Sequence, residues 1–481
     1  MPDFDVLAIG GGTAGLTVAI GGTLFGMKTA LVERHRVGGE CTWTGCVPSK
    51  AILHVADVAA SVRKAAAWSK NGAPALDLDF AKVRDYVHAT RADIWQHESP
   101  PALREMGVTV LEGAALIRSA GPKEITVEVD GRIVTARHVV ICTGSDPAVP
   151  SVDGLPETRY FTNESIFDEL EELPRRLAVI GGGPIGSELA QAFARLGSEV
   201  TLIQSQDRLL PREDAAVAPV LRKALEDDGI RVLTGARLSR VTPVGDGSRG
   251  ATLSIDGQTD INVDAVLVST GRRARIKGCG LEEVGVKLGR DGIEVDTHLQ
   301  TSVPRIWAAG DCVGPYRFTH VAEMMGRTVL RNIMFPWKKQ AVDYSVTPWC
   351  TFTDPEIGRV GLTEADARKQ FGDEVNVAVH PMSRNDRAVT EGSTAGFIKL
   401  VTRRKHILGA HIVGPAAGEL TQTVALAMKW NLPTFALSMV TIYPAVSYGL
   451  HQVSDRASMQ ALKRHRFPRA MLKIVRKLAL R

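Results

Sequence analysis

Two cysteines near the N-terminus have the type and spacing for redox chemistry. Cys41 and Cys46 are separated by four residues in the segment GGECTWTGCVPSK, residues 38–50. A disulfide needs Cα atoms roughly 4.4–6.8 Å apart. Because the two positions are separated by more than one α-helical turn, we expect Gly45 to help the loop bend. The pair predicts a redox-active disulfide, with two buried structural thiols as the alternative.

The cysteine content indicates a reducing environment. The chain has 6 cysteines, of which only Cys41 and Cys46 form a close pair. A large chain with its own core does not need disulfide cross-links, so we expect a cytoplasmic protein. No cysteine and histidine positions show zinc-site spacing, so no metal site is predicted.

Length and composition favour an α/β protein with several domains. The chain has 481 residues, 46 glycines and 24 prolines, and 44% of its residues are hydrophobic. The net charge of +5 and the lack of a basic, aromatic-interleaved stripe argue against nucleic-acid binding. The uncharged run between Asp5 and Lys28 is long enough for a membrane helix. Its seven glycines indicate a strand, a turn and a helix instead.

A glycine signature of dinucleotide-binding folds lies at the start of the chain. After the apolar run 6–9, Gly10, Gly12 and Gly15 form the pattern G-x-G-x-x-G. These glycines allow the turn, the approach of a pyrophosphate and close helix packing. Glu33 ends the next apolar run, 23 residues after Gly10, where a carboxylate can hold ribose hydroxyls. This copy suits an unphosphorylated ribose, such as that of FAD.

The same arrangement recurs later in the chain. After the apolar run 177–180, Gly181, Gly183 and Gly186 repeat the glycine pattern, and Gln204 stands 23 residues after Gly181. Two complete signatures predict two nucleotide sites.

The residue that ends the second copy bears on the coenzyme. Gln204 is uncharged and would not repel a 2′-phosphate. Positive charge for that phosphate could come from Arg208, Arg272 and Arg273. We therefore expect NADPH rather than NADH, although Gln204 could also serve NADH by hydrogen bonding.

Three further stretches carry a family resemblance. They are residues 140–145 (VICTGS), 269–272 (STGR) and 301–311 (TSVPRIWAAGD). With the cysteine segment and the two signatures, they resemble the class I pyridine nucleotide-disulfide oxidoreductases from about residue 3 to 460. The run GCVPSK is most similar to mercuric reductase-like members. The resemblance implies further cofactor-binding residues, namely Gly39, Lys50, Thr143, Gly144, Ser145, Gly271, Arg272, Gly310 and Asp311.

The resemblance also implies an architecture. We expect two Rossmann-like nucleotide-binding domains, for FAD and NAD(P)H, and a C-terminal α+β dimerisation domain. The implied order is FAD domain (1–150), NAD(P)H domain (151–270), return to the FAD domain (271–340), interface domain (341–460) and basic tail (461–481). Family members are homodimers whose active sites use both chains, and we expect the same here.

Catalytic roles follow from the same resemblance. Cys46 would form the charge-transfer contact with the flavin, and Cys41 would attack the acceptor. Lys50 would lie near the reactive edge of the flavin and pair with Glu188, and Asp311 would bond the ribityl chain. A helix N-terminus and Lys50 would lower the pKa of a thiolate. Electrons would pass from NAD(P)H through FAD and the disulfide to an acceptor.

One motif departs from the family pattern. Disulfide-reducing relatives carry His-Pro-x-x-x-Glu near the C-terminus, whereas residues 443–448 read YPAVSY, with Tyr443 and Tyr448 in place of histidine and glutamate. A tyrosine is a poor base at neutral pH but can donate a hydrogen bond. The departure argues against glutathione reductase and dihydrolipoyl dehydrogenase activity. His451 could reach Tyr448 over one helical turn, or could be an ordinary surface residue.

The acceptor is the open question. Mercuric reductase also lacks that histidine, but it has adjacent C-terminal cysteines, and here no cysteine follows Cys350. We expect a soft metal ion such as Hg(II), a quinone or an uncommon disulfide as acceptor. A low-turnover flavin redox sensor or binding protein is the alternative.

The end of the chain is basic. Residues 463–481 contain nine Lys, Arg or His residues. Met471, Leu472, Val475 and Leu478 could share one helix face, which suits peripheral contact with the inner face of an anionic membrane. A tail packed on its own dimer, or a disordered tail, is the alternative.

Overall fold

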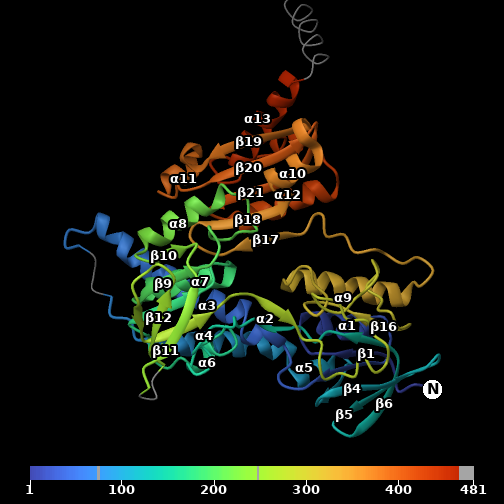
Figure 1. Cartoon of the computed structure of the whole chain (residues 1–481). Coiled ribbons are helices and arrows are strands. Elements are labelled where there is room, and N and C mark those ends of the chain that lie inside the picture. The colour runs from blue at the N-terminus through green and yellow to red at the C-terminus, as the bar shows by residue number, and fades with distance from the viewer. Residues whose placement is uncertain (73–75, 246–248, 465–481) are drawn as a thin grey trace, which may run out of the picture. The chain divides into compact units, whose positions relative to one another are not determined.

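The computed structural model describes residues 1–72, 76–245 and 249–464. The chain forms two compact units (Figure 1). The first comprises Met1–Gly181, Arg195–Glu199 and Leu238–Val342; the second comprises Gly182–Ala194, Val200–Arg237 and the chain from Asp343 onward. The predicted basic tail lies outside the described residues from residue 465 onward. The predicted boundaries of the nucleotide and interface domains stay a prediction.

The first unit is built on a seven-stranded sheet in the order β3-β2-β1-β6-β5-β4, with β16 also paired to β6. Strands β1, β2, β3, β6 and β16 run parallel, and β4 and β5 are antiparallel. The bounds are β1 (Phe4–Ile9), β2 (Thr29–Glu33), β3 (Thr109–Glu112), β4 (Ala115–Ala120), β5 (Ile125–Val129), β6 (Arg132–Ile141) and β16 (Ile306–Ala308). All of β1 except Asp5 is buried, as is the end of β6 from Val139 to Ile141, as expected for strands covered on both faces.

The helices of this unit position the cysteine segment. α1 and α9 pack against each other, as do α3 and α4. The bounds are α1 (Thr13–Leu24), α2 (Gly39–Trp43), α3 (Cys46–Lys64), α4 (Phe80–Trp95), α5 (Pro100–Glu105), α6 (Ile166–Glu169) and α9 (Thr319–Met334). The strand, turn and helix predicted for the long uncharged run are confirmed as β1 and α1. No helix in the described part of the chain is both long and apolar enough to cross a membrane.

Smaller sheets complete the first unit. β8 (Arg176–Ile180) and β14 (Ala265–Val268) pair in parallel, and β7 (Ser145–Pro147) pairs antiparallel with β15 (Arg272–Ala274). β11 (Leu238–Pro243), β12 (Ala251–Ile255) and β13 (Ile261–Val263) form an antiparallel sheet. The pairing of β7 with β15 joins two of the stretches that carried the family resemblance.

The second unit combines part of the second nucleotide signature with a C-terminal α+β layer. β9 (Glu199–Gln204) pairs in parallel with β10 (Arg231–Thr234). The helices of this nucleotide-binding part are α7 (Pro184–Leu196) and α8 (Val217–Asp227). A five-stranded antiparallel sheet follows, in the order β17-β18-β21-β20-β19. Its bounds are β17 (Pro348–Thr351), β18 (Glu356–Gly361), β19 (Val375–Pro381), β20 (Phe397–Arg403) and β21 (His406–Gly414).

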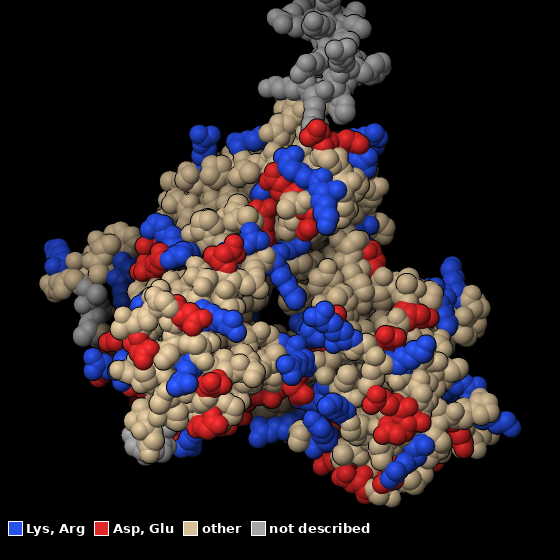
Figure 2. All heavy atoms as spheres, in the orientation of Figure 1, with Lys and Arg blue, Asp and Glu red and all other residues tan. Residues whose placement is uncertain are grey.

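Four helices accompany this sheet. They are α10 (Glu364–Phe371), α11 (Asp386–Thr390), α12 (Ala417–Lys429) and α13 (Tyr448–Arg464). α12 packs on β18 and β21, and α13 packs on β19 and β20. The predicted α/β class, with a C-terminal α+β part, is confirmed. On the face shown in Figure 2, acidic and basic side chains intermingle.

Candidate active site

The first glycine signature leaves room for a pyrophosphate. Gly10 has a φ of +110°, and a Cβ there would come within 2.2 Å of the carbonyl oxygen of Cys142. At Gly12 the nearest atom to an added Cβ is the Cα of Gly39, at 3.8 Å. The backbone is therefore open at Gly12, beside the N-terminus of α1, where phosphate groups bind. This space fits the diphosphate of FAD.

Glu33 lies at the end of β2 and faces this loop. Its Oε2 accepts a hydrogen bond from the amide of Gly11 at 2.6 Å, and its Oε1 accepts one from the amide of His35 at 2.8 Å. The carboxylate is thus held where it can accept hydroxyl groups of a ribose. The donor set fits the adenosine part of FAD.

The second signature repeats this geometry. An added Cβ at Gly183 would meet no atom within 4 Å. Gln204 accepts a hydrogen bond from the amide of Gly182 at 3.4 Å, as Glu33 does from Gly11. The Nε2 of Gln204 donates to the carbonyl of Arg208 at 3.3 Å, so Arg208 lies in the same loop. The site suits a second dinucleotide.

The two cysteines lie close together. Cys41 is in the short helix α2, and Cys46 is the first residue of α3. The two side chains are in the reduced form and lie within hydrogen-bonding range of each other. Gly45 permits the turn between them, because a Cβ there would come within 2.9 Å of the carbonyl oxygen of Glu40. The Sγ of Cys46 lies 3.3 Å from the Oγ1 of Thr319, at the start of α9.

The two thiols have unequal surroundings. The hydrogen bond to Cys46, followed by burial, raises the pKa of Cys41 well above its usual value. Cys46 begins a 19-residue helix, and the helix N-terminus favours an anion there. The expected lowering of a thiolate pKa therefore does not apply to Cys41. The hydrogen bond and burial favour the protonated form of Cys41.

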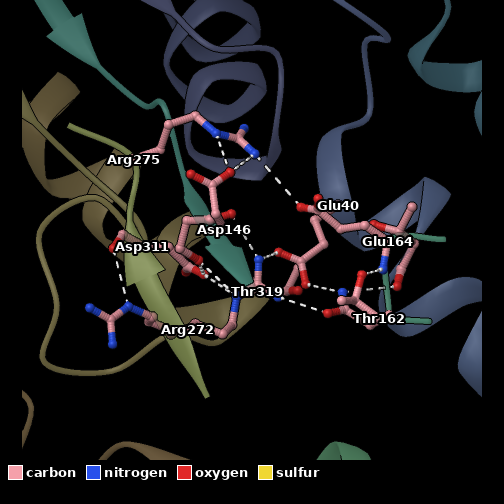
Figure 3. Close-up of polar contacts among 12 residues, drawn as sticks. Glu40, Asp146, Thr162, Glu164, Arg272, Arg275, Asp311 and Thr319 are labelled. Carbon is pink, nitrogen blue, oxygen red and sulfur yellow. Dashed lines mark hydrogen bonds and ion pairs between the residues drawn. The ribbon is translucent and has the colours of Figure 1, made fainter. Parts of the chain in front are cut away.

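Several predicted cofactor residues meet beside this pair (Figure 3). Asp311 accepts a hydrogen bond from the hydroxyl of Ser145 at 2.7 Å, and the Nε of Arg272 donates to the same hydroxyl at 2.8 Å. Arg272 is also ion-paired with Glu40, which the sequence reasoning missed. The only sequence signal for Glu40 was its position directly before Cys41. The hydroxyl of Thr143 donates to the carbonyl of Arg275 at 2.6 Å.

The structure corrects one use of Arg272. The sequence offered it as positive charge for the phosphate of the second nucleotide. Its guanidinium contacts Glu40, Ser145, Asn163 and Asp311, which all belong to the first unit. Arg272 is thereby committed to residues around the cysteine loop and is not available as a free positive charge.

The predicted partners Lys50 and Glu188 belong to different units. Lys50 lies one helical turn after Cys46 on α3. Glu188 is buried on α7, and its Oε1 accepts a hydrogen bond from the amide of Phe352 at 2.8 Å. Their pairing stays a prediction.

The tyrosines that replace the histidine and glutamate are brought together. Tyr443 donates to the Oδ2 of Asp386 at 2.9 Å, and this hydrogen bond raises the pKa of Tyr443. The ring centroids of Tyr443 and Tyr448 are 5.4 Å apart, and those of Tyr448 and His451 are 4.8 Å apart. The side chain of His451 is 25% exposed, and its Nδ1 lies 3.2 Å from the carbonyl of Ser438. His451 therefore packs on Tyr448, as the helical spacing allowed.

Among the described residues, no three or more Cys, His, Asp or Glu side chains cluster in a way that could hold a metal ion.

Comparison with known proteins identifies the family. Residues 4–326 match the family model described as pyridine nucleotide-disulphide oxidoreductase, and residues 347–453 match the dimerisation domain of that family. A dihydrolipoyl dehydrogenase of Thermus scotoductus is 36% identical over 96% of this chain and 99% of its own length. A mercuric reductase of Staphylococcus aureus is 35% identical over 89% of this chain and 78% of its own length.

Solved structures agree with this assignment. The HOCl-induced flavoprotein disulfide reductase RclA from Escherichia coli superposes with a TM-score of 0.83 at 26% identity, covering 94% of this chain and 99% of that chain. LpdA from Mycobacterium tuberculosis superposes with a TM-score of 0.83 at 27% identity, covering 94% of this chain and 99% of that chain. The chain therefore belongs to the pyridine nucleotide-disulfide oxidoreductases, the flavoproteins that use FAD, NAD(P)H and a redox disulfide and carry a C-terminal dimerisation domain.

Proposed function

We propose that this chain is a mercuric reductase-like enzyme that passes electrons from NADPH, through FAD and the Cys41–Cys46 pair, to an acceptor other than glutathione disulfide or lipoamide. The candidate acceptors are a soft metal ion such as Hg(II), a quinone and an uncommon disulfide. The observation that carries the proposal is the cysteine pair itself. Cys46 stands at a helix N-terminus, and Cys41 keeps its proton beside it.

The residues of the chain divide the work as follows. Bound FAD supplies the hydride chemistry that links NAD(P)H to the disulfide. Two electrons and one proton, equivalent to the hydride of NAD(P)H, would break the Cys41–Cys46 bond and leave one thiol and one thiolate. Asp311, Ser145 and Arg272 form the hydrogen-bonded group that would hold the ribityl part of the cofactor.

The hydrogen bonding and the raised pKa of Tyr443 support an acceptor whose reduction needs no strong proton donor. Its hydroxyl is committed to Asp386, and its pKa is raised above the usual value for tyrosine. At neutral pH such a hydroxyl neither takes up nor releases a proton readily. Reduction of a disulfide requires a proton for the departing thiolate, whereas capture of a soft cation by thiolates does not.

Two similar proteins suggest that metal ions should be tested as acceptors. Mercuric reductases are among the curated relatives, and RclA has been solved as a Cu(II) complex. Thiolates are soft ligands, and Cys41 and Cys46 could bind either ion directly.

The test is steady-state oxidation of NADPH with Hg(II), Cu(II), quinones, glutathione disulfide and lipoamide. We expect turnover with at least one of the first three, and loss of that turnover in Cys41→Ser while the flavin is still reduced by NADPH. Cys279→Ser is the matched control, because Cys279 lies outside the pair, and it should keep full turnover. Full turnover in Cys41→Ser would exclude the dithiol route. Flavin reduction without turnover on any acceptor would favour a redox sensor.

A further inference from the structure

The carboxyl group of Glu40, directly before Cys41, is held from two sides (Figure 3). Its Oε1 accepts a hydrogen bond from the Nδ2 of Asn163 at 3.1 Å, and its Oε2 is ion-paired with Arg272. The side chain of Arg272 is 10% exposed, and Asn163 is 6% exposed. The amide of Asn163 also donates to the carbonyl of Thr44, inside the cysteine loop, at 3.4 Å. The position of this carboxyl is thus fixed by buried partners.

Arg272 connects this carboxyl to the predicted flavin-binding residues. Its Nε donates to the hydroxyl of Ser145 at 2.8 Å, and its Nη2 donates to the carbonyl of Ser145 at 2.9 Å. The same hydroxyl donates to Asp311 at 2.7 Å. A continuous chain of hydrogen bonds therefore runs from the residue before Cys41 to Asp311. Such a chain transmits a change of charge at one end to the other.

The groups that face Glu40 have opposing effects. Burial has the largest effect and, with the negative charges of Asp311, Glu164 and Cys46, it favours the protonated form. The positive charge of Arg272 favours the ionised form. The net result raises the pKa of Glu40 to about 7.

A second ion-pair group stands beside the first. Arg275 pairs with Asp146 and lies 3.6 Å from Glu164. Glu40, Asp311, Glu164 and Asp146 thus share two guanidinium groups. The guanidinium of Arg317 also reaches this group, at the carbonyl of Asp311, 3.4 Å away. Four carboxylates against three arginines leave a local excess of negative charge, to which a thiolate at Cys46 would add one more.

We propose that Glu40 is a positioning residue of the cysteine loop whose proton follows the oxidation state of the Cys41–Cys46 pair. Reduction by two electrons and one proton, equivalent to the hydride of NAD(P)H, breaks the disulfide and creates one thiol and one thiolate. The new negative charge at Cys46, in the same loop, disfavours the ionised form of Glu40, so that Glu40 takes one proton from solvent. Oxidation of the pair by the acceptor releases that proton. The inference rests on the proposed dithiol route.

The experiment measures how the reduction of the pair depends on pH. The FAD-loaded enzyme is equilibrated in dithiothreitol redox buffers across neutral pH, and alkylation with mass spectrometry gives the reduced fraction of Cys41 and Cys46. One extra proton bound on reduction changes the equilibrium constant by up to about tenfold per pH unit. We expect this extra dependence near pH 7 in the wild type and its loss in Glu40→Gln. The pH dependence of dithiothreitol itself is the same for both proteins, so it cancels when the wild type and Glu40→Gln are compared.

Two further variants sharpen the result. Glu98→Gln is the matched control, because Glu98 accepts a hydrogen bond from Thr42 of the same loop at 2.8 Å. It should keep the wild-type dependence. Arg272→Gln removes the positive charge that favours ionised Glu40. The pH range in which the equilibrium constant for reduction shows the extra dependence should therefore move to higher pH. This variant also carries the test if Glu40→Gln fails to fold or to retain FAD.

The outcomes separate the inference from the proposed function. A wild type whose cysteines do not cycle between disulfide and dithiol overturns the proposed function. Cysteines that cycle with the same pH dependence in wild type and Glu40→Gln overturn the role of Glu40 alone.

Discussion

At the scale of single residues, the second nucleotide site repeats the first with one change of charge. Glu33 and Gln204 end corresponding strands and accept a hydrogen bond from corresponding glycine amides. The carboxylate would repel a 2′-phosphate, whereas the neutral amide would not. Arg208 shares the loop of Gln204, and its guanidinium donates to the carbonyl of Pro211 at 2.9 Å, so its charge belongs to the same loop. We therefore propose NADPH as the coenzyme.

Gln204→Glu should reverse this preference. The ratio of kcat/KM for NADPH to that for NADH should fall by roughly tenfold to a hundredfold, because the new carboxylate repels the phosphate and holds the ribose hydroxyls. Arg208→Gln should weaken NADPH use without improving NADH use. Steady-state kinetics with both coenzymes measures the change. A wild type that prefers NADH would contradict the coenzyme proposal.

At the scale of elements, the second unit contains a buried network of charged side chains that no sequence motif predicted. Lys399 on β20 lies 2.9 Å from Asp214 and 2.7 Å from Glu364, and the side chains of Lys399 and Asp214 are nearly buried. His411 on β21 is fully buried, with its Nε2 3.7 Å from Glu213. These residues tie the segment before α8 to the C-terminal sheet within the second unit.

His411 should make stability depend on pH. Burial lowers its pKa to about 3, below the ordinary value of about 6.5 in the unfolded chain. The unfolded chain binds more protons between these values, so stability is lost as pH falls from about 6.5 towards 3. In His411→Leu, the urea midpoint of unfolding should fall less over this range.

His406→Gln provides the comparison for that measurement. His406 is the first residue of the same strand and hydrogen-bonds to Asn431 at 2.8 Å near the surface. It should keep the wild-type dependence on pH. If His411→Leu and the wild type lose stability in parallel as pH falls, another buried group controls the acid transition.

At the scale of the whole molecule, the second unit exposes an apolar segment that a partner should cover. The exposed side chains are Phe435 (51%), Met439 (71%), Val440 (92%), Ile442 (73%) and Tyr443 (63%). Contiguous apolar surface of this kind usually marks an interface. The segment lies within the region that matches the dimerisation domain of the family, so we expect it to contact a second copy of this chain.

Val440→Asp should weaken the homodimer. A charge placed in an apolar interface would have to be desolvated, which costs several kcal/mol. Sedimentation or light scattering should show a shift towards monomer at low protein concentration. Trp68→Ser is the control, because Trp68 is 86% exposed in the first unit and should leave the dimer intact. An unchanged dimer in Val440→Asp would place the interface elsewhere.

Much of the fold and part of the site could be predicted because the signals are local. The two glycine signatures, the strands before them and the acceptors Glu33 and Gln204 follow from fixed spacings along the chain. The closeness of Cys41 and Cys46 needed only a loop of four residues and a glycine at 45. The family resemblance implied that Ser145, Arg272 and Asp311 bind the cofactor, and the structure brings these three side chains together.

Only the tertiary structure revealed the contacts between residues that lie far apart in the sequence. Glu40 meets Arg272 across 232 positions, and Lys399 meets Asp214 across 185. The spacing of residues along the chain cannot predict such pairs, because they depend on how strands from distant segments align in the folded chain. The sequence determined which cofactor chemistry the chain carries. The folded structure decided that the pKa of Cys41 is raised and which partners hold the carboxyl of Glu40, because burial and neighbouring charges exist only after folding.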